Sequence, residues 1–328
     1  MRRKWSLLSL LVLVSIDVSA CAAGGDGSYP KEALEIVAPA GAGGGWDTLA
    51  RTMQRSLEQE KLYPQPMSVV NKTGGGGAVG MAYVVAKKGT DYNLVVYSPP
   101  LIIGGINKTF QNSYKDLTPL AKLITDYQVI LVKADSKYKT LKDLLADLKA
   151  NPGAVKFAGG SAPGNMDHLA IAKIAKLAGV NPKDMVYIDF NGGGEAMTAL
   201  LGGNVAFMSS GAGESIAQLQ AGTVRALAIT SAERRGGPLK DVPTVKEQGI
   251  DTTYEVWRGV FGPPAMSDAA KKYWDDQLKK MVASKSWKDS LTTLQWTDAY
   301  ANGSDFAKFL DQENKSYADL MTDLGFAK

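Results

Sequence analysis

Residues 34–60 read LEIVAPAGAGGGWDTLARTMQRSLEQE. The apolar run 34–39 predicts a short strand, the glycine-rich residues 41–45 a tight turn, and the spacing of Leu49, Met53 and Leu57 a helix over 47–60. The first N–H groups of a helix have no partner inside it, and the helix dipole places partial positive charge there. A strand, a glycine turn and a helix start together therefore make a site that suits an anion.

This succession of strand, glycine-rich turn and helix occurs five times. The apolar runs are 34–39, 67–71, 155–158, 186–190 and 205–208, and the glycine-containing stretches after them are 41–47, 74–77, 159–164, 191–194 and 209–213. One such turn is explained by the closing of a strand–helix connection. Five of them favour a cleft in which several helix N-termini bind a carboxylated or phosphorylated small molecule through backbone groups.

The first twenty residues have the pattern of an export signal. Arg2, Arg3 and Lys4 precede an apolar stretch over 7–16 that is shorter than a typical membrane span. Residues 18–21 read VSAC, which matches a bacterial lipobox with Cys21 as the lipidated residue and also fits ordinary signal-peptide cleavage. Because Cys21 is the only cysteine, and a lone thiol is unusual in an exported protein, we favour lipidation. The glycine-rich residues 21–28 predict a flexible tether.

Charge and cysteine content exclude several classes of function. The net charge of +4 falls to +2 once residues 1–20 are removed, and no basic tract is present. The sequence therefore lacks the electrostatic footprint of a nucleic-acid-binding protein. No stretch after the signal is apolar and long enough to span a membrane. A single cysteine allows no internal disulfide and no thiolate metal site, and we expect neither a metal nor a cofactor.

Strand and helix signals alternate along the chain, which predicts an α/β fold of mainly parallel sheets with helices on both faces. Beyond the five units, strands are expected at 93–98, 120–124, 128–133, 225–230 and 254–261. Residues 125–127 are expected to separate the strand at 120–124 from the strand at 128–133. Leu141, Leu144 and Leu148 mark a helix that ends at residues 151–153. From Ser267 the chain is expected to be helical to its end.

The glycine-rich turns divide into two groups, two before Thr125 and three after it. We therefore predict a first domain made of 29–125 and 253–328, and a second domain made of 126–252. The late helices would complete the first domain, and two strands crossing between the domains would form a hinge.

Motifs of enzymatic chemistry are weak. Gly75, Gly77 and Gly80 have the spacing of a dinucleotide fingerprint, but the acidic residue expected about twenty positions later is missing. Neither a P-loop nor a nucleophile elbow occurs. The single histidine, His168, has Asp167 beside it in sequence, where a helix does not turn the two toward each other. We expect no enzyme, and we expect His168 to be a polar residue in the first turn of a helix near the cleft.

Three other residues each allow two interpretations. Asp47 is either a helix cap that pairs with Arg51 or a residue that also lines the cleft. Trp46 projects from the first glycine turn and is either a cover at the rim or a wall of the ligand site. Arg258 lies in the presumed returning strand, where its guanidinium either forks onto a carboxylate or faces solvent.

Six segments resemble the tripartite tricarboxylate transporter substrate-binding proteins, the Bug-type periplasmic receptors. They are residues 37–51, 70–80, 161–169, 200–205, 221–230 and 241–245, in the family's order and over nearly the whole chain after its signal. The resemblance implies a two-domain periplasmic-binding-protein fold of the Venus flytrap, type II-like kind. It also implies a receptor for a carboxylate, and the Gly-Trp-Asp and Met-Asp-His-Leu segments are similar to the tricarboxylate branch.

The resemblance further implies which residues bind the ligand, by backbone groups and ordered water in two loops and by side chains of the second domain. These residues are Ala40, Gly41, Gly43, Gly44, Gly45, Trp46 and Asp47 in the first loop; Thr73, Gly74, Gly75 and Gly76 in the second; Ser98 after the next strand; and Ser161, Asn165, Asp167, Asn191, Gly192, Ser209 and Ser210 from the second domain. Residues 40–42 replace prolines that many members carry. Trp46 replaces a small residue, so we expect a narrowed or capped pocket.

The implied function is an extracytoplasmic receptor that captures a citrate-like di- or tricarboxylate and delivers it to integral-membrane transporter subunits. The protein is expected to be a monomer in the periplasm or cell envelope, attached to the membrane only through Cys21. A sensor that passes its signal to a receptor and an exported enzyme on the same scaffold are the alternatives. The sequence does not name the carboxylate, nor say whether Arg258 or His168 touches it.

Overall fold

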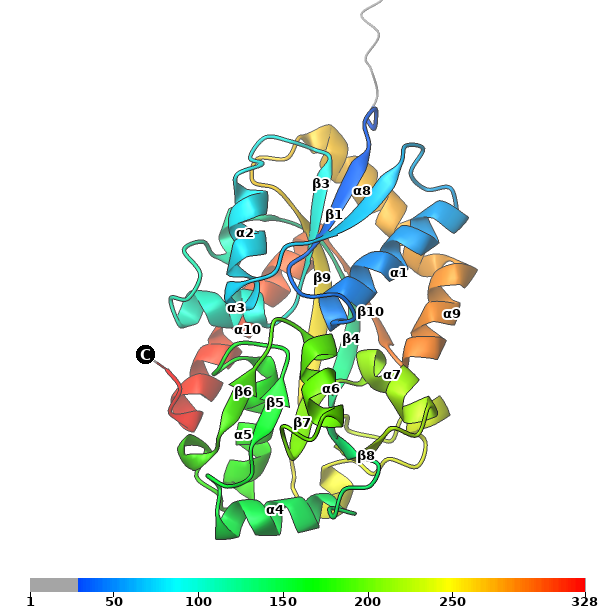
Figure 1. Ribbon diagram of the computed structural model, residues 1–328. Coiled ribbons are helices and arrows are strands. Elements are labelled where there is room, and N and C mark those ends of the chain that lie inside the picture. Colours follow the sequence, from blue (N-terminus) through cyan, green and yellow to red (C-terminus); the bar gives the residue numbers. More distant parts are fainter. Residues whose placement is uncertain (1–28, 328) are drawn as a thin grey trace, which may run out of the picture.

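The structure is a computed structural model and describes residues 29–327; Cys21, the predicted signal and the tether lie outside these residues. Two lobes lie one above the other and are joined by β4 and β9 (Figure 1). The strands are β1 (Leu34–Ala38), β2 (Met67–Asn71), β3 (Asn93–Tyr97), β4 (Thr118–Lys133), β5 (Phe157–Gly159), β6 (Tyr187–Asp189), β7 (Phe207–Gly211), β8 (Val224–Ile229), β9 (Glu255–Gly262) and β10 (Thr297–Asn302). The α-helices are α1 (Gly45–Gln59), α2 (Ala78–Val85), α3 (Pro100–Ile106), α4 (Leu141–Ala150), α5 (Met166–Leu177), α6 (Gly193–Leu201), α7 (Ala212–Gln220), α8 (Asp268–Ala283), α9 (Lys285–Leu294) and α10 (Gly303–Leu324).

One sheet continues through both lobes. Its order in the first lobe is β2-β1-β3-β9-β4-β10, and in the second lobe β8-β4-β7-β5-β6. The strands of the glycine-turn units pair in parallel, β1 with β2 and β3, and β5 with β6 and β7. All pairs that involve β4 or β9 are antiparallel. The prediction of mainly parallel sheets is therefore correct for the repeated units and wrong for the strands that join them.

β4 corrects the prediction of two strands separated by residues 125–127. It is a single strand whose first part pairs with β9 and β10, and whose last part pairs with β7 and β8. The polar residues Asp126 and Gln128 did not interrupt it because both are fully buried and hydrogen-bonded. β4 and β9 are the two strands that cross between the lobes, as the sequence predicted. The residue boundaries of the two domains remain a prediction.

Two further expectations were wrong. Residues 297–302, expected to be helical, form the edge strand β10, in which Thr297 lies opposite Thr125 of β4. Ser209 and Ser210, expected in a glycine-rich turn, belong to β7 and pair with β4. In both cases a partner strand supplies backbone hydrogen bonds that the local sequence does not reveal.

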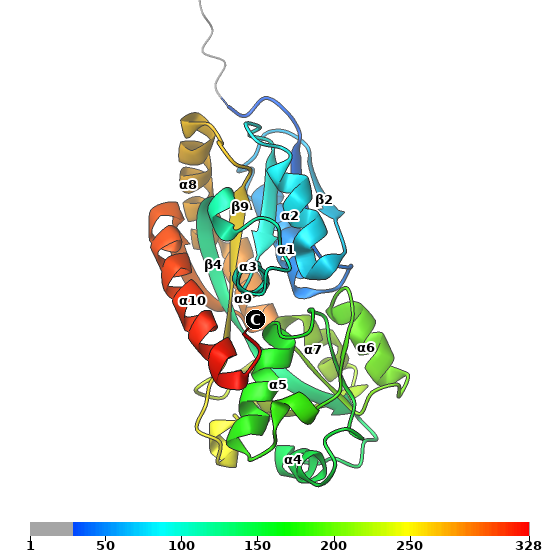
Figure 2. The ribbon, with the colours of Figure 1, turned by 90° about the vertical axis from the view of Figure 1, so that its left-hand side faces the viewer.

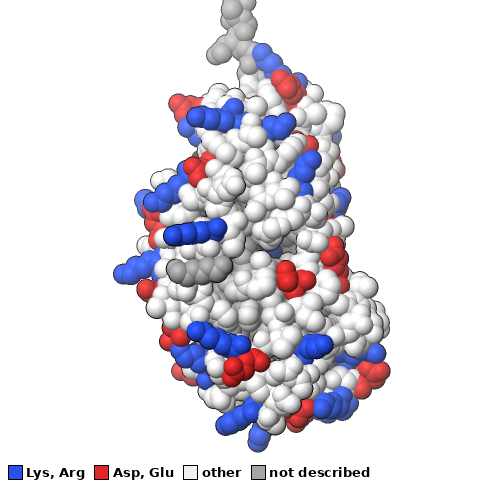
Figure 3. Space-filling model, turned by 60° about the vertical axis from the view of Figure 1, so that its left-hand side comes forward, with Lys and Arg blue, Asp and Glu red and all other residues white. Residues whose placement is uncertain are grey.

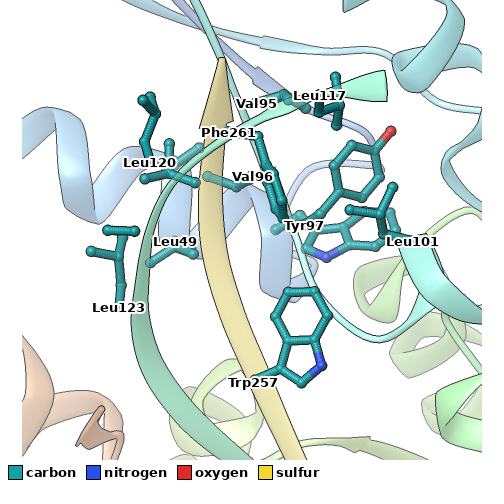
Figure 4. Close-up of a cluster of buried hydrophobic side chains, with 14 of the residues drawn as sticks. Leu49, Val95, Val96, Tyr97, Leu101, Leu117, Leu120, Leu123, Trp257 and Phe261 are labelled. Atoms are coloured by element: carbon teal, nitrogen blue, oxygen red, sulfur yellow. The ribbon is translucent and has the colours of Figure 1, made fainter. Parts of the chain in front are cut away.

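The late helices α8, α9 and α10 complete the core of the first lobe, as predicted. Their buried residues Trp274, Trp287 and Phe306 share one hydrophobic cluster with β1, β3 and β9. Figure 4 shows Tyr97, Trp257 and Phe261 in this cluster, around β9. Figure 2 shows α10 running beside β4 toward the second lobe. There Lys176 of α5 forms an ion pair with Asp323 of α10, 2.7 Å apart.

Phe306 anchors α10 on the hinge strand β9. Its ring is fully buried, with its centroid 5.1 Å from Phe261 and 5.6 Å from Trp257. We expect Phe306→Ala to lower the free energy of unfolding by about 3–5 kcal/mol, because it removes a large ring from a closed core. The matched control Phe309→Ala, one turn further on and half-buried, should cost clearly less. Equal losses in the free energy of unfolding, measured by urea titration of the two variants, would contradict this packing.

Candidate functional site

A small cavity lies between the lobes, where the first glycine turn faces the turns of the second lobe. It encloses about 20 Å³, which is room for about one water molecule. The cleft is closed at this point, since the Gly41 N–H donates to the Asn191 carbonyl oxygen across it (2.9 Å). The lining residues are Ala40, Gly44, Gly45, Trp46, Pro100, Gly160, Ser161, Met166, Asp167, Gly192, Gly193, Glu214 and Arg258.

Helix N-termini from both lobes open onto this cavity. Gly44 and Gly45 begin α1 from the first lobe, while Gly192 and Gly193 begin α6 from the second. The two turns meet so closely that a Cβ on Gly194 would lie 2.7 Å from the carbonyl oxygen of Ala42. Glycine is required at Gly194 because this approach leaves no room for a side chain. The free N–H groups at these two helix starts make the cavity suitable for an anion.

Asp47 holds the first turn in shape. Its carboxylate accepts hydrogen bonds from the Gly43 N–H (3.0 Å), the Arg51 guanidinium (2.9 Å) and the Asn71 amide (2.9 Å). Burial raises the pKa of Asp47, but the hydrogen bonds from Arg51, Gly43 and Asn71 outweigh it, so that the pKa falls below its usual value. The expected pairing with Arg51 is confirmed, but the N-cap of α1 is Gly44, and Asp47 lies in the first turn with its carboxylate reaching back to Gly43. Asp47 is absent from the cavity lining.

Trp46 forms a wall of the cavity and does not cover its rim. Its side chain is buried, its Nε1–H donates to Ser98 Oγ (2.8 Å), and its ring meets Tyr97 edge-on. Ser98 Oγ also lies 3.7 Å from the Met166 sulfur of the second lobe. Ser98 thus contacts two residues that line the cavity, Trp46 and Met166, and its role as a ligand residue remains a prediction.

The second glycine turn lies outside this cavity. Gly74, Gly75, Gly76 and Gly77 all have positive φ, which other residues rarely adopt. A Cβ on Gly76 would lie 3.0 Å from the Cβ of Ala162 in the second lobe. The turn thus lies against the opposite lobe beside the cavity. The binding roles of Thr73, Gly74, Gly75 and Gly76 remain predictions.

The other predicted site residues divide into two groups. Ala40, Gly44, Gly45, Trp46, Ser161, Asp167 and Gly192 line the cavity. Gly41, Gly43, Asn165, Asn191, Ser209 and Ser210 stand around it and make supporting contacts or belong to the adjoining strand. Asn165, for example, caps α5 by accepting from the Met166 N–H (2.8 Å). That any of them binds a ligand is still a prediction.

A buried charged cluster forms the floor of the cavity, and sequence reasoning largely missed it. Arg258 of β9 donates from Nη2 to Asp126 Oδ2 of β4 (3.1 Å), and the same Nη2 lies 4.0 Å from Glu214 Oε1 of α7. The Arg258 side chain is only 1% exposed, so the solvent-facing interpretation is wrong. Asp167 of α5 completes the cluster and accepts from the Gln128 amide (3.0 Å). The sequence signal for it was a pair of polar residues, Asp126 and Gln128, inside an apolar strand.

Burial changes the protonation of this cluster. It raises the pKa of Glu214 to about 7 and that of Asp167 to about 6, although Arg258 favours the ionised form of both. The two carboxyl groups therefore take up protons in a range where ordinary carboxylates are ionised. Asp126, the third acidic residue of the cluster, accepts hydrogen bonds from the Tyr127 and Gly213 N–H groups.

His168 faces away from the cavity. Its ring stacks on Tyr187 (4.7 Å between centroids) and lies near Phe326, while Nδ1 accepts from the Gly164 N–H (3.0 Å). Burial lowers its pKa to about 4, which keeps it neutral. His168 is therefore a packed residue in the first turn of α5, as the sequence predicted in part, and it does not line the cavity.

The remaining surface and composition are consistent with a small-molecule site. Figure 3 shows lysine, arginine, aspartate and glutamate side chains interspersed over one face. Within residues 29–327, no group of three or more histidine, cysteine or acidic side chains is arranged to hold a metal ion. None of the helices in this range combines the length and apolarity that a membrane crossing requires.

Comparisons with known proteins agree with this picture. The model of a family described as the tripartite tricarboxylate transporter family receptor matches residues 49–326. A UPF0065 protein of Agrobacterium vitis, from the TAR-I ttuE-ttuC' intergenic region, is 30% identical over 275 residues, covering 82% of this chain and 77% of the relative. Protein BugT of Bordetella pertussis is 28% identical over 307 residues, 91% of each chain.

Two solved structures are similar in fold. The periplasmic binding protein BugD has a TM-score of 0.83 at 24% identity, over 92% of this chain and 100% of that one. MatC of Rhodopseudomonas palustris, with bound malate, has a TM-score of 0.79 at 21% identity, over 89% of this chain and 99% of that one. These similarities identify the architecture as the two-domain fold of periplasmic solute-binding proteins.

The raised carboxyl pKa values predict how stability depends on pH. A folded-state pKa above the unfolded value makes folding bind protons, so the stability cost of Glu214 grows from about pH 4 to about pH 7 and is constant above. Glu214→Gln keeps an acceptor for the Gly211 N–H (3.0 Å) and removes the titrating group. We expect its melting temperature relative to the natural protein to rise with pH across this window, by an amount worth up to about 3 kcal/mol.

The measurement is a series of thermal melts of both proteins between about pH 4 and about pH 8. A constant difference between the two curves would show that Glu214 titrates as an ordinary exposed carboxylate, contrary to its burial.

Proposed function

This chain belongs to the tripartite tricarboxylate transporter receptor family, and we propose that it captures a di- or tricarboxylate between its lobes and delivers it to membrane transporter subunits. Its family and its structural neighbours are solute-binding proteins of the periplasm, not enzymes. The malate bound by MatC supports a small carboxylate as the ligand class. Export and attachment through Cys21 are part of the same proposal, since an exported receptor must stay near its transporter.

One observation carries the proposal: helix starts of opposite lobes meet over a buried arginine. Gly44 and Gly45 approach from the first lobe, Gly192 and Gly193 from the second, and Arg258 lies below them. Backbone N–H groups at helix starts bind carboxylates through partial charge and hydrogen bonds, and arginine binds them with a planar fork. A carboxylate placed here would touch both lobes at once.

Entry of a ligand requires the lobes to separate. A cavity of about 20 Å³ is far smaller than a dicarboxylate, and the Gly41–Asn191 hydrogen bond closes it. The lobes are connected through β4 and β9, so bending there would open the cleft. A ligand favours the closed form only as far as it binds that form better, which contacts with both lobes provide.

The proposal is tested by thermal shift with citrate, malate, glutamate and glucose on the natural protein and two glycine variants. A ligand at a hundred times its Kd adds about 2.7 kcal/mol, a shift of a few degrees, and we expect one from citrate or malate. Gly45→Ala should abolish the shift, because its Cβ would overlap the Arg258 guanidinium in the cavity. Gly105→Ala, in a helix where a Cβ meets nothing within 4 Å, is the matched control and should retain it.

Absence of any shift from both carboxylates would contradict the carboxylate receptor. A shift that is unchanged in Gly45→Ala would place binding outside this cavity.

A further inference from the structure

The acidic side chains at the floor of the cavity are not explained by anion binding alone. Asp126, Asp167 and Glu214 surround a single guanidinium, that of Arg258, in a site that we propose binds a carboxylate. A ligand carboxylate would add a fourth acidic group to this buried cluster. Like charges at close range disfavour ionisation in a site that excludes water, so the cluster must respond to the ligand.

Two polar side chains of the cluster, Arg258 and Glu214, have hydrogen-bonding atoms without a partner among the described residues. Nε and Nη1 of Arg258 and Oε2 of Glu214 are buried and have no hydrogen-bond partner among the described residues. The Arg258 side chain is 1% exposed and that of Glu214 7%, and both border the cavity. Buried polar atoms normally have partners, so these three atoms mark positions where a ligand group is expected.

The geometry gives the two residues complementary roles. Arg258 offers N–H donors toward Gly45, at the start of α1, where a carboxylate oxygen would also meet backbone N–H groups. Glu214 Oε1 already accepts from the Gly211 N–H (3.0 Å), which leaves Oε2 as the oxygen free to carry a proton. A protonated carboxyl group is a strong donor to a carboxylate and adds no negative charge.

We propose that Arg258 and Glu214 form a subsite that binds one carboxylate group of the ligand together with one proton, held on Glu214 Oε2. The proposal rests on the proposed function, because it assumes an anionic ligand. The proton comes from solvent when the cleft closes and returns to solvent when the ligand leaves. Arg258 and the helix starts donate to one oxygen of the ligand, and the Glu214 hydroxyl donates to the other.

The surroundings of Glu214 support proton uptake there. The charged and titratable groups facing it are Asp126 from β4, Asp167 from α5 and Arg258 from β9, and Tyr187 and Tyr254 lie near Asp167. Burial already places the pKa of Glu214 near 7. A neighbouring anion raises the pKa further, so that the ligand complex holds a proton that the free protein has partly lost.

Whether protons are taken up or released on binding distinguishes a carboxylate ligand from a ligand that carries an ammonium group. If one proton enters with the ligand, affinity falls as pH rises above the free-site pKa, by up to about tenfold per pH unit. A ligand carrying an ammonium group would instead need ionised Asp167 and Glu214. It would bind more tightly at higher pH and release protons.

The test is titration calorimetry of the exported protein with malate at about pH 7 and about pH 8, and with citrate at about pH 8. Each titration is run in HEPES and in Tris, whose different ionisation enthalpies reveal how many protons are exchanged, whereas phosphate could occupy an anion site itself. For malate, which is fully ionised at both pH values, we expect uptake of up to one proton and a loss of affinity of several-fold to about tenfold. Citrate, whose last proton dissociates at lower pH, serves as the second probe at about pH 8 only.

Two variants test whether Glu214 is the group that takes up the proton. Glu214→Gln carries a permanent N–H donor in place of the protonated oxygen, and should bind malate with an affinity that changes less than twofold with pH. Its proton uptake should vanish. Glu233→Gln is the control, an exposed acidic residue in the loop after β8, and should keep the uptake of the natural protein.

Binding without proton uptake, or with proton release, would overturn the proposal while leaving the receptor function intact. No heat from either ligand in the natural protein at any pH would instead contradict the proposed function. If Glu214→Gln fails to melt cooperatively, the buffer comparison on the natural protein still decides the outcome.

Discussion

The ion pair between Arg258 and Asp126 joins the two strands on which the arrangement of the molecule depends. Asp126 lies in β4 between the part that pairs with β10 and the part that pairs with β7, and Arg258 lies on β9, which runs antiparallel beside β4. A buried ion pair is stable only when its remaining polar atoms are satisfied. Asp126 meets this condition through two backbone N–H groups, whereas Arg258 keeps two nitrogens without a partner. The same arginine therefore belongs to the connection between the lobes and to the cavity that they enclose.

The glycine turns explain how so small a site is built. In each lobe a parallel strand leads into a glycine-containing turn, and the next helix begins at the cavity. Because the helix starts that face the cavity offer backbone N–H groups, the recognition of a negative charge there depends little on the rest of the ligand. Discrimination between ligands must come from the lining side chains, among them Trp46, Ser161, Met166 and the charged cluster.

Much of the fold was predictable because it follows from local patterns. Apolar runs, glycine turns and helical spacing placed β1, α1 and the later units within a few residues of their observed bounds. The errors have one cause in common: β10, the middle of β4, and Ser209 and Ser210 in β7 are strands made by pairing with distant residues. Local polarity suggested turns or helix there, and tertiary hydrogen bonds decided otherwise.

The sequence predicted the glycine turns of the site but largely missed its buried charged cluster. Resemblance to a family located the first turn and Asp167. Asp126 could be suspected from its place inside an apolar strand, but no local pattern distinguishes Glu214 from a surface acid. Asp126 and Glu214 become significant only when folding buries them around Arg258.

The most direct test of the account is a crystal structure of the protein grown with malate or citrate. The account predicts a ligand carboxylate between the starts of α1 and α6, within hydrogen-bond distance of Arg258 and Glu214. A ligand bound elsewhere, or one that leaves both side chains untouched, would contradict it.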